Sequence, residues 1–311
     1  MELTRKDFLR LSAGSAALLA AGGPGLIADA SAGEAPILTR KVGKTGEVLP
    51  LVGLGTAQTF GDVIEGDGFE QRKNVIKALT DNGGTLIDTS PTYSNAEAVT
   101  GKAMRELGTR NKIYISTKIS ITGEQAGIDQ FNKSLKDLGT DHVELLHIHN
   151  LRDFDTHLKT VRRLKAEGKA KAIGATHFQD RSYDDMVKVM KTANLDWIQI
   201  NYAIDDRGAE KEILPLAKDL GMGVMLNLPF GRDRLFDKVK GKAVPEWAIQ
   251  DLGCDTWAKF FLKYLISNEA VTCAIPGTTF PHHVPDNMGA ARGRLPDEAT
   301  RKKMIAHIES L

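Results

Sequence analysis

Four titratable side chains stand where predicted strands end. Asp88 closes one short apolar run, and Tyr93 follows it by five residues. Lys118 and His149 close the next two runs along the chain. If these runs are parallel strands of one sheet, their carboxyl ends meet at a common edge. We therefore expect the four side chains to converge on one site.

The chemistry expected of this set is acid catalysis on a carbonyl group. A tyrosine hydroxyl has an ordinary pKa of about 10, so a cationic neighbour is needed to favour the phenolate. Lys118 would supply that charge, and Asp88 would keep the buried lysine protonated. His149 would hydrogen-bond and orient the carbonyl. Hydride must come from a cofactor, because no side chain donates one.

The elements that must position these residues alternate between short apolar runs and segments of helical period, as repeated βα units do. Helices are expected at residues 70–81, 96–107, 125–138, 157–168 and 210–220, several ending at glycine. Strands are expected at residues 51–56, 85–89, 113–118, 142–149, 172–177, 197–202, 223–229 and 271–277.

Eight strands in one chain predict an α/β fold, a (β/α)8 TIM barrel over residues 37–311, with a hairpin over residues 38–48 closing its floor. An open doubly wound sheet is the alternative. That fold expects G-x-G-x-x-G after its first strand, and the segment Gly53-Leu54-Gly55-Thr56 lacks the third glycine. The barrel is therefore favoured.

The composition is that of an ordinary globular protein. The 311 residues include 41 basic and 40 acidic side chains, so no basic face for nucleic acid is expected. Cys254 and Cys273 are too few for a disulfide framework or a structural zinc site. The expected substrate is a small molecule with an aldehyde, ketone or sugar carbonyl, or the corresponding alcohol, and the chain is expected to act as a monomer.

Residues 1–32 read as an export signal. A polar start with Arg5, Lys6 and Arg10 precedes a small apolar run at residues 11–21. Residues 4–9 (TRKDFL) resemble the twin-arginine signal except at Lys6, and small residues before Glu34 offer a cleavage site. The apolar run is short for a membrane anchor. A periplasmic or secreted location is expected; the general secretory route and an uncleaved amphipathic helix are the alternatives.

Six segments in order resemble the motifs of the aldo/keto reductase family, and the resemblance extends from residue 38 to the end. They are residues 86–97 (LIDTSPTYSNAE), 115–118 (ISTK), 134–145 (SLKDLGTDHVEL) with His149, 173–178 (IGATHF), 199–202 (QINY) and 275–277 (IPG). The likeness implies the barrel, a nicotinamide cofactor, and a catalytic tetrad of Asp88, Tyr93, Lys118 and His149, with Tyr93 as the general acid.

The same resemblance implies a set of cofactor-binding residues. Thr176, His177 and Gln199 match positions that hold the nicotinamide carboxamide, and Asp286 and Asn287 match those that face the adenine. The full expected set is Gly55, Thr56, Thr176, His177, Gln199, Asn227, Pro229, Gly231, Arg232, Gly277, Thr278, His283, Asp286 and Asn287.

This chain departs from the family pattern at the cofactor. Asn227 stands where members often have an aromatic ring beneath the nicotinamide. Gly277 and His283 stand where members that prefer the 2′-phosphorylated cofactor carry lysine and arginine, and a histidine is a weaker phosphate ligand. Arg232 and Arg234, after the seventh strand, are expected to contact the pyrophosphate instead. NADP is expected because the family commonly uses it, with NAD as the alternative.

Two other functions stay open. His147 and His149 lie on one strand face, as in metal-dependent barrel hydrolases, and with His177 and Asp88 they would make a metal site. We expect no metal, because the catalytic aspartate that such hydrolases carry at the last strand is missing. The other alternative is a sensor that binds cofactor with little catalysis.

Overall fold

Eight parallel strands form the centre of the structure, a computed structural model that describes residues 35–311. Each strand pairs with the next one along the chain. The strands are β3 (Leu54–Gly55), β4 (Leu86–Asp88), β5 (Tyr114–Ile119), β6 (Val143–Ile148), β7 (Ala170–Thr176), β8 (Trp197–Asn201), β9 (Gly223–Asn227) and β10 (Cys273–Ala274). Parallel bridges from Val52 to Ala274 and from Gly55 to Gly277 join the last strand to the first. The predicted (β/α)8 barrel is confirmed.

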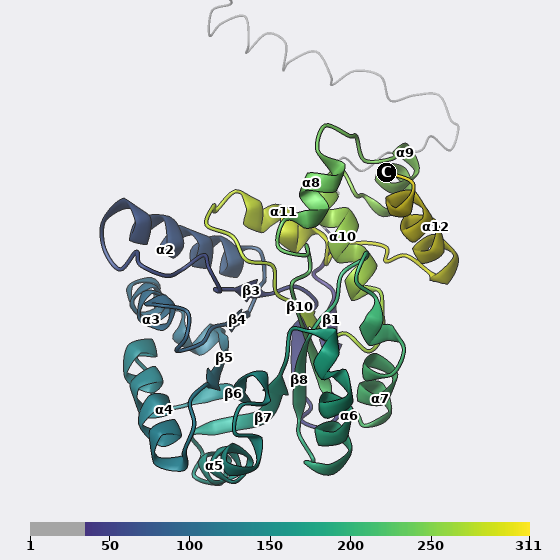
Figure 1. Cartoon of the computed structure of the whole chain (residues 1–311). Coiled ribbons are helices and arrows are strands. Elements are labelled where there is room, and N and C mark those ends of the chain that lie inside the picture. Colours follow the sequence, from purple (N-terminus) through teal and green to yellow (C-terminus); the bar gives the residue numbers. More distant parts are fainter. Residues whose placement is uncertain (1–34) are drawn as a thin grey trace, which may run out of the picture. The chain divides into compact units, whose positions relative to one another are not determined.

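Eleven α-helices accompany the strands in the described part of the chain, and Figure 1 shows α2 to α7 surrounding the barrel. They are α2 (Gly66–Asp81), α3 (Ala96–Leu107), α4 (Glu124–Leu138), α5 (Phe154–Ala166), α6 (Tyr183–Thr192), α7 (Ile213–Asp219), α8 (Arg234–Val239), α9 (Glu246–Leu252), α10 (Trp257–Ile266), α11 (His283–Gly289) and α12 (Glu298–Glu309). As expected, α3 and α4 end at left-handed glycines, Gly108 and Gly139.

The barrel interior is filled by side chains and closed at the amino ends of its strands by a hairpin. Strands β1 (Thr39–Lys41) and β2 (Val48–Pro50) pair antiparallel. Val42 and Leu49 of this hairpin belong to the same buried cluster as Leu145 and Trp197 of the strands. The Lys44 amide also donates to the Gly221 carbonyl, just before β9. The predicted hairpin is confirmed.

Some element boundaries differ from the prediction. The strand expected at residues 271–277 is reduced to β10, because Pro276 has no amide hydrogen to continue the ladder. The helix expected at residues 210–220 begins later, as α7 at Ile213, after a 3-10 turn over Gly208–Glu210. Gly277, predicted at the end of the last strand, therefore lies three residues beyond β10, and it still lines the cavity.

Backbone strain is concentrated at one end of the barrel. Ten described non-glycine residues have a positive φ, and all but Asn194 lie in the loops after β3, β4, β6 and β9. Such conformations cost free energy for most side chains, persist where the surrounding structure holds them, and cluster at functional sites. The residues are Gln58, Asp62, Ser94, Asn150, Leu151, Asp153, Leu228, Arg232 and Asp233.

Between residues 35 and 311, no helix is both long enough and apolar enough to span a bilayer. The predicted export signal, residues 1–32, lies outside the described residues.

Candidate active site

A cavity of about 610 Å3 opens at the carboxyl ends of the strands. The loops after β3, β4 and β6 form one side, which we call the catalytic side. Side chains of β7 and β8 and the loops after β7, β9 and β10 form the opposite side, which we call the β7–β10 side. Asp88, Tyr93 and His149 line the cavity, as the sequence predicted, and Lys118 lies beneath it.

Lys118 and Asp88 form an ion pair inside the barrel. The Lys118 Nζ donates to both Asp88 carboxylate oxygens, at 2.9 and 2.8 Å, and to the Thr89 carbonyl at 2.7 Å. Ser116 donates to Asp88 Oδ1 at 2.7 Å. Burial alone would lower the pKa of Lys118, but Asp88 and Tyr93 outweigh it, and the net shift is upward. A permanent positive charge therefore lies below the cavity.

Tyr93 lies between this charge and the cavity. The Lys118 Nζ is 5.2 Å from the centre of the Tyr93 ring. Burial raises the pKa of the Tyr93 hydroxyl, Lys118 opposes the rise, and Asp88 adds to it, so the net shift is upward. Tyr93 thus holds its proton at neutral pH beside a cation that would stabilise the phenolate left after proton donation.

His149 faces Tyr93 edge to face, with ring centres 6.0 Å apart. Burial, Lys118, Arg152 and His177 lower the pKa of His149 to about 3, so the imidazole is neutral at physiological pH. Its Nδ1 lies 3.4 Å from the Ser90 hydroxyl. When Ser90 donates to Nδ1, the ring proton lies on Nε2, the arrangement needed to donate to a carbonyl oxygen.

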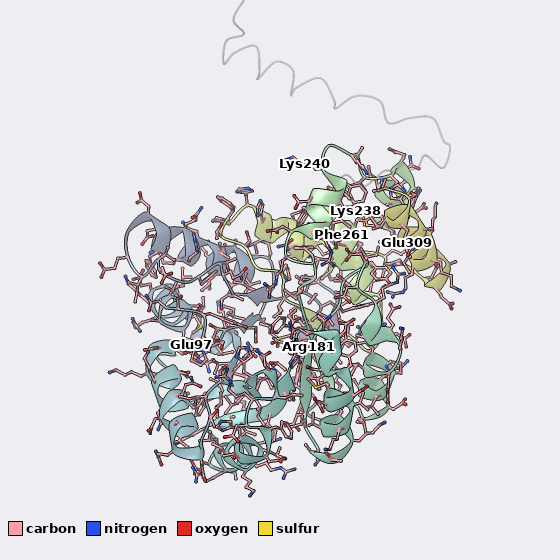
Figure 2. All side chains as sticks on the ribbon, in the orientation of Figure 1. Glu97, Arg181, Lys238, Lys240, Phe261 and Glu309 are labelled. Carbon is pink, nitrogen blue, oxygen red and sulfur yellow. The ribbon has the colours of Figure 1, made fainter. Side chains whose placement is uncertain are left out.

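A buried glutamate supports this site, and the sequence reasoning did not assign it a role. Glu97 of α3, labelled in Figure 2, is 3% exposed and accepts hydrogen bonds from Thr117 at 2.5 Å and Ser134 at 2.9 Å. Thr117 directly precedes Lys118 in β5. Burial raises the pKa of Glu97 to about 7. The position of Glu97 four residues after Tyr93 was its only sequence signal.

On the β7–β10 side, three predicted cofactor residues bring polar groups to the cavity. Gln199 donates only to the Met225 sulfur, at 3.0 Å. Asn227 donates to the His177 carbonyl at 3.3 Å, while its buried Oδ1 has no partner among the described residues. Thr176 accepts a hydrogen bond from the Asn150 amide at 3.0 Å. The Gln199 amide and the Asn227 Oδ1 therefore have unused hydrogen-bonding capacity, which a ligand carrying a carboxamide would satisfy.

Seven of the fourteen predicted cofactor residues line the cavity, and seven do not. Those that line it are Gly55, Thr176, Gln199, Asn227, Pro229, Arg232 and Gly277. Gly55 and Gly277 bring the first and last strands together, because a Cβ on Gly55 would lie 2.7 Å from the Ile275 carbonyl. The others are Thr56, His177, Gly231, Thr278, His283, Asp286 and Asn287.

Several residues outside the lining are engaged with neighbours. The two ring nitrogens of His177 contact the Gln179 amide at 3.2 Å and the Ser182 hydroxyl at 3.0 Å. Thr56 donates to the Asp88 carbonyl at 3.0 Å. Both carboxylate oxygens of Asp286 accept from Thr256 at 2.9 Å. These bonds are local, and the roles assigned to these residues by resemblance remain predictions.

A further contact joins two residues after β10. The Thr278 hydroxyl lies 3.0 Å from His283 Nδ1. Burial lowers the pKa of His283, so this side chain is mainly neutral at physiological pH. It would thus be a weak ligand for a 2′-phosphate.

The geometry does not support the alternative of a metal site at His147 and His149. His147 is fully buried and does not line the cavity, and its two ring nitrogens have no partner among the described residues. Within residues 35–311, no group of three or more His, Cys, Asp or Glu side chains is placed to hold a metal ion.

Phe178 and Leu228, which the sequence reasoning did not single out, do line the cavity.

Comparison with known proteins supports both the fold and the family. The chain is similar to the aldo-keto reductase YhdN of Bacillus subtilis (strain 168), 30% identical over 57% of each chain. It is also similar to an NADH-specific methylglyoxal reductase of Escherichia coli (strain K12), 26% identical over 85% of this chain and 97% of that one. The fold matches an aldo/keto reductase from Klebsiella pneumoniae solved with NADP and acetate, with a TM-score of 0.72, 23% identity and coverage of 88% and 95% of the two chains.

The family assignment covers most of the barrel. A family model described as "Aldo/keto reductase family" matches residues 51–306, which include the whole predicted tetrad. The chain therefore belongs to the aldo/keto reductase family of oxidoreductases.

Proposed function

We propose that this protein reduces the carbonyl group of a small molecule with NADP as its cofactor, NAD being the alternative, and that Tyr93 is the general acid. One observation carries the assignment of roles: a buried, charged Lys118–Asp88 pair lies beneath a protonated Tyr93 that shares the cavity with a neutral His149. This arrangement supplies a proton donor and a carbonyl-orienting group at one place.

The residues divide the acid chemistry between them. Tyr93 donates its proton to the carbonyl oxygen, and the charge on Lys118 stabilises the phenolate that forms. Asp88 holds the lysine ammonium through two hydrogen bonds. His149 donates from Nε2 to the same carbonyl oxygen and fixes its position. When bound, the nicotinamide cofactor supplies the hydride that no side chain provides.

The β7–β10 side of the cavity fits the carboxamide of a nicotinamide. Asn227 offers an unused buried acceptor, and Gln199 offers an amide whose present acceptor is a thioether, a weak one. Arg232 lines the same side and is the expected contact for the pyrophosphate. Tyr93 and His149 face these groups from the catalytic side.

The relatives support both the reaction class and the choice of cofactor. One structural neighbour was solved with NADP, while one curated relative is named an NADH-specific methylglyoxal reductase. Another, from Escherichia coli (strain K12), is named methylglyoxal reductase YeaE. These names motivate including methylglyoxal among the first substrates and testing both cofactors.

The proposed location is the periplasm or the cell exterior, with residues 1–32 as the export signal. Its support is the resemblance of residues 4–9 to the twin-arginine signal. The test is to fractionate bacteria that express the full chain or a variant with both Arg5→Gln and Lys6→Gln. Retention of only the variant in the cytoplasm supports twin-arginine export, and retention of both forms contradicts export.

The function is tested by titrating the purified protein with NADPH and NADH and following cofactor fluorescence. Single-turnover reduction of methylglyoxal, butanal and erythrose is then measured with each bound cofactor. Saturable binding with aldehyde-dependent oxidation of the cofactor is the expected result. Binding without turnover on any aldehyde would favour the sensor alternative, and no binding to either cofactor would overturn the proposal.

A further inference from the structure

A buried serine lies behind the active site with its hydroxyl group next to a catalytic residue. Ser90 is fully buried and does not line the cavity. Its Oγ lies 3.4 Å from His149 Nδ1, and this is the one hydrogen bond that holds the His149 ring among residues 35–311. The Ser90 hydroxyl therefore acts on a bound substrate through His149 and not by direct contact.

The turn that carries Tyr93 also fixes the position of Ser90. The Tyr93 amide donates to the Ser90 carbonyl at 3.1 Å, and Pro91 occupies the second position of this turn. Proline at that position sets the backbone dihedral angle φ that the commonest turn type requires. The general acid and the hydrogen-bond partner of His149 thus belong to one turn.

The hydrogen bonds around Ser90 assign the direction of its hydroxyl proton. The Thr92 amide donates to Ser90 Oγ at 3.3 Å, and the Thr92 hydroxyl lies 2.9 Å from the same atom. Within the described residues the Thr92 hydroxyl has no other partner, so its proton is satisfied when it donates to Ser90. Both lone pairs of the Ser90 oxygen are then occupied, and its own proton is left with one acceptor, His149 Nδ1.

The reverse direction leaves a proton without an acceptor in the described part of the protein. His149 is neutral and carries one ring proton, because burial and the nearby cations keep its pKa at about 3. If that proton were on Nδ1 and donated to Ser90, Ser90 would donate to Thr92, and the Thr92 proton would have no partner. The ring would also present Nε2 to the cavity as an acceptor, which cannot bind a carbonyl oxygen.

We propose that Ser90 is a positioning residue, which donates to His149 Nδ1 and thereby keeps the ring proton on Nε2 for the carbonyl oxygen of the substrate. This inference rests on the proposed reductase function and adds a residue to it. Thr92 sets the direction in which Ser90 donates. The contribution is that of one hydrogen bond, so its loss slows the reaction without abolishing it.

The first test locates the ring proton by NMR at neutral pH. The histidines are labelled with the NMR-active nitrogen isotope, and the signals of His149 are identified among the eight histidines as those lost in His149→Gln. In a neutral imidazole, the protonated nitrogen and the acceptor nitrogen have widely separated chemical shifts. In the wild-type protein, Nε2 is expected to be the protonated nitrogen and Nδ1 the acceptor.

The second test removes the hydroxyl in Ser90→Ala. The separation between the two His149 shifts is expected to decrease, because both tautomers become populated. The kcat/KM for butanal is expected to fall about three- to tenfold, the effect of one hydrogen bond. The Kd for NADPH is expected to stay within about twofold of the wild type, because Ser90 does not line the cavity.

A matched control makes the same substitution at a serine away from the cavity. The Ser267 hydroxyl donates to the Tyr264 carbonyl at 2.7 Å and accepts from Arg301 at 2.7 Å. Ser267→Ala therefore also removes hydrogen bonds of a partly buried serine, but Ser267 does not line the cavity or contact His149. It is expected to leave both the His149 shifts and the kcat/KM for butanal unchanged.

The outcomes distinguish the role of Ser90 from the function it rests on. A proton on Nε2 in the wild type, with altered shifts and lower kcat/KM in Ser90→Ala but not in Ser267→Ala, supports the proposal. A proton on Nδ1 in the wild type, unchanged shifts in Ser90→Ala, or a kcat/KM within about twofold of the wild type overturns it while the reductase function stands. No turnover of any aldehyde with either cofactor overturns the function and the role of Ser90 together.

Discussion

At the residue scale, Glu97 is a carboxyl group whose environment alters its ionisation. It is buried between α3, β5 and α4, and its partners are two hydroxyl groups rather than a cation. Desolvation by burial raises its pKa from an ordinary 4.5 to about 7. Near neutral pH the folded protein therefore holds a proton that the unfolded chain releases.

This difference predicts how Glu97→Gln changes the pH dependence of stability. Because the folded pKa is raised, the contribution of Glu97 to stability is fully present below pH 4.5 and is lost as the pH rises through about 7. The shift corresponds to roughly 3 kcal/mol at alkaline pH. Glutamine does not titrate, so the variant should gain stability relative to the wild type between pH 5 and pH 8. Urea unfolding at these two pH values measures the change, and parallel pH profiles for both proteins would contradict it.

Three of the four tetrad residues that the sequence identified share one property. Asp88, Lys118 and His149 stand at strand ends, where the fold alone fixes the direction of the side chain. His177 also follows a strand, but its ring is directed by bonds to the Gln179 amide and Ser182. Bonds of that kind depend on loop dihedral angles, which residue types do not specify.

At the scale of elements, α3 and α4 pack closely at Gly101. A Cβ there would lie 2.2 Å from the Asp137 carbonyl oxygen and 2.7 Å from the Leu138 backbone. Both neighbours are backbone atoms near the end of α4, so neither moves without shifting the helix. Glycine at this position sets the distance between the two helices.

Gly101→Ala is therefore expected to destabilise the protein by at least about 2 kcal/mol, although alanine favours helices. Thermal unfolding should show a lower Tm. The control is Gly108→Asn, because Gly108 has a φ of +63° with open space around it, and asparagine tolerates that region. A Tm for Gly101→Ala equal to that of the wild type would show that the helices adjust freely.

Element boundaries were predictable where a local signal was strong. The helix expected at residues 96–107 appears with the same limits, since Gly108 ends it in the left-handed conformation. By contrast, α8 and α9 have only 6 and 7 residues, too short for a helical period to be read over a window of 11–18 residues. Such helices form through packing, which the sequence pattern does not display.

At the scale of the whole molecule, the alternation of eight apolar runs with helical segments predicted a parallel α/β fold, and the missing third glycine after Gly53 and Gly55 favoured the barrel over the open sheet. The closure of the barrel between its first and last strands was the hardest feature to predict from the sequence. It depends on backbone contacts of Gly55 with Gly277 and Pro276, and not on a side-chain pattern. The hairpin contributes Val42 and Leu49 to the interior cluster, so residues before the first barrel strand also belong to the core.

Residues 35–311 form one compact unit of their own. We expect a protein truncated to these residues to unfold within about 2 °C of the full chain, because it keeps every side chain of the hydrophobic core described between residues 35 and 311. Scanning calorimetry of the two forms makes the comparison. A markedly lower Tm for the truncated form would mean that residues 1–34 contribute to folded stability.

The central claim is that Tyr93 donates the proton to the carbonyl, and Tyr93→Phe tests it most directly. The variant keeps the ring and loses the hydroxyl, so NADPH binding should stay within about threefold of the wild type while kcat falls by about 10²–10⁴-fold. Binding by fluorescence titration and turnover on erythrose and butanal are measured on the same preparation. A kcat within tenfold of the wild type, with binding intact, would contradict the account.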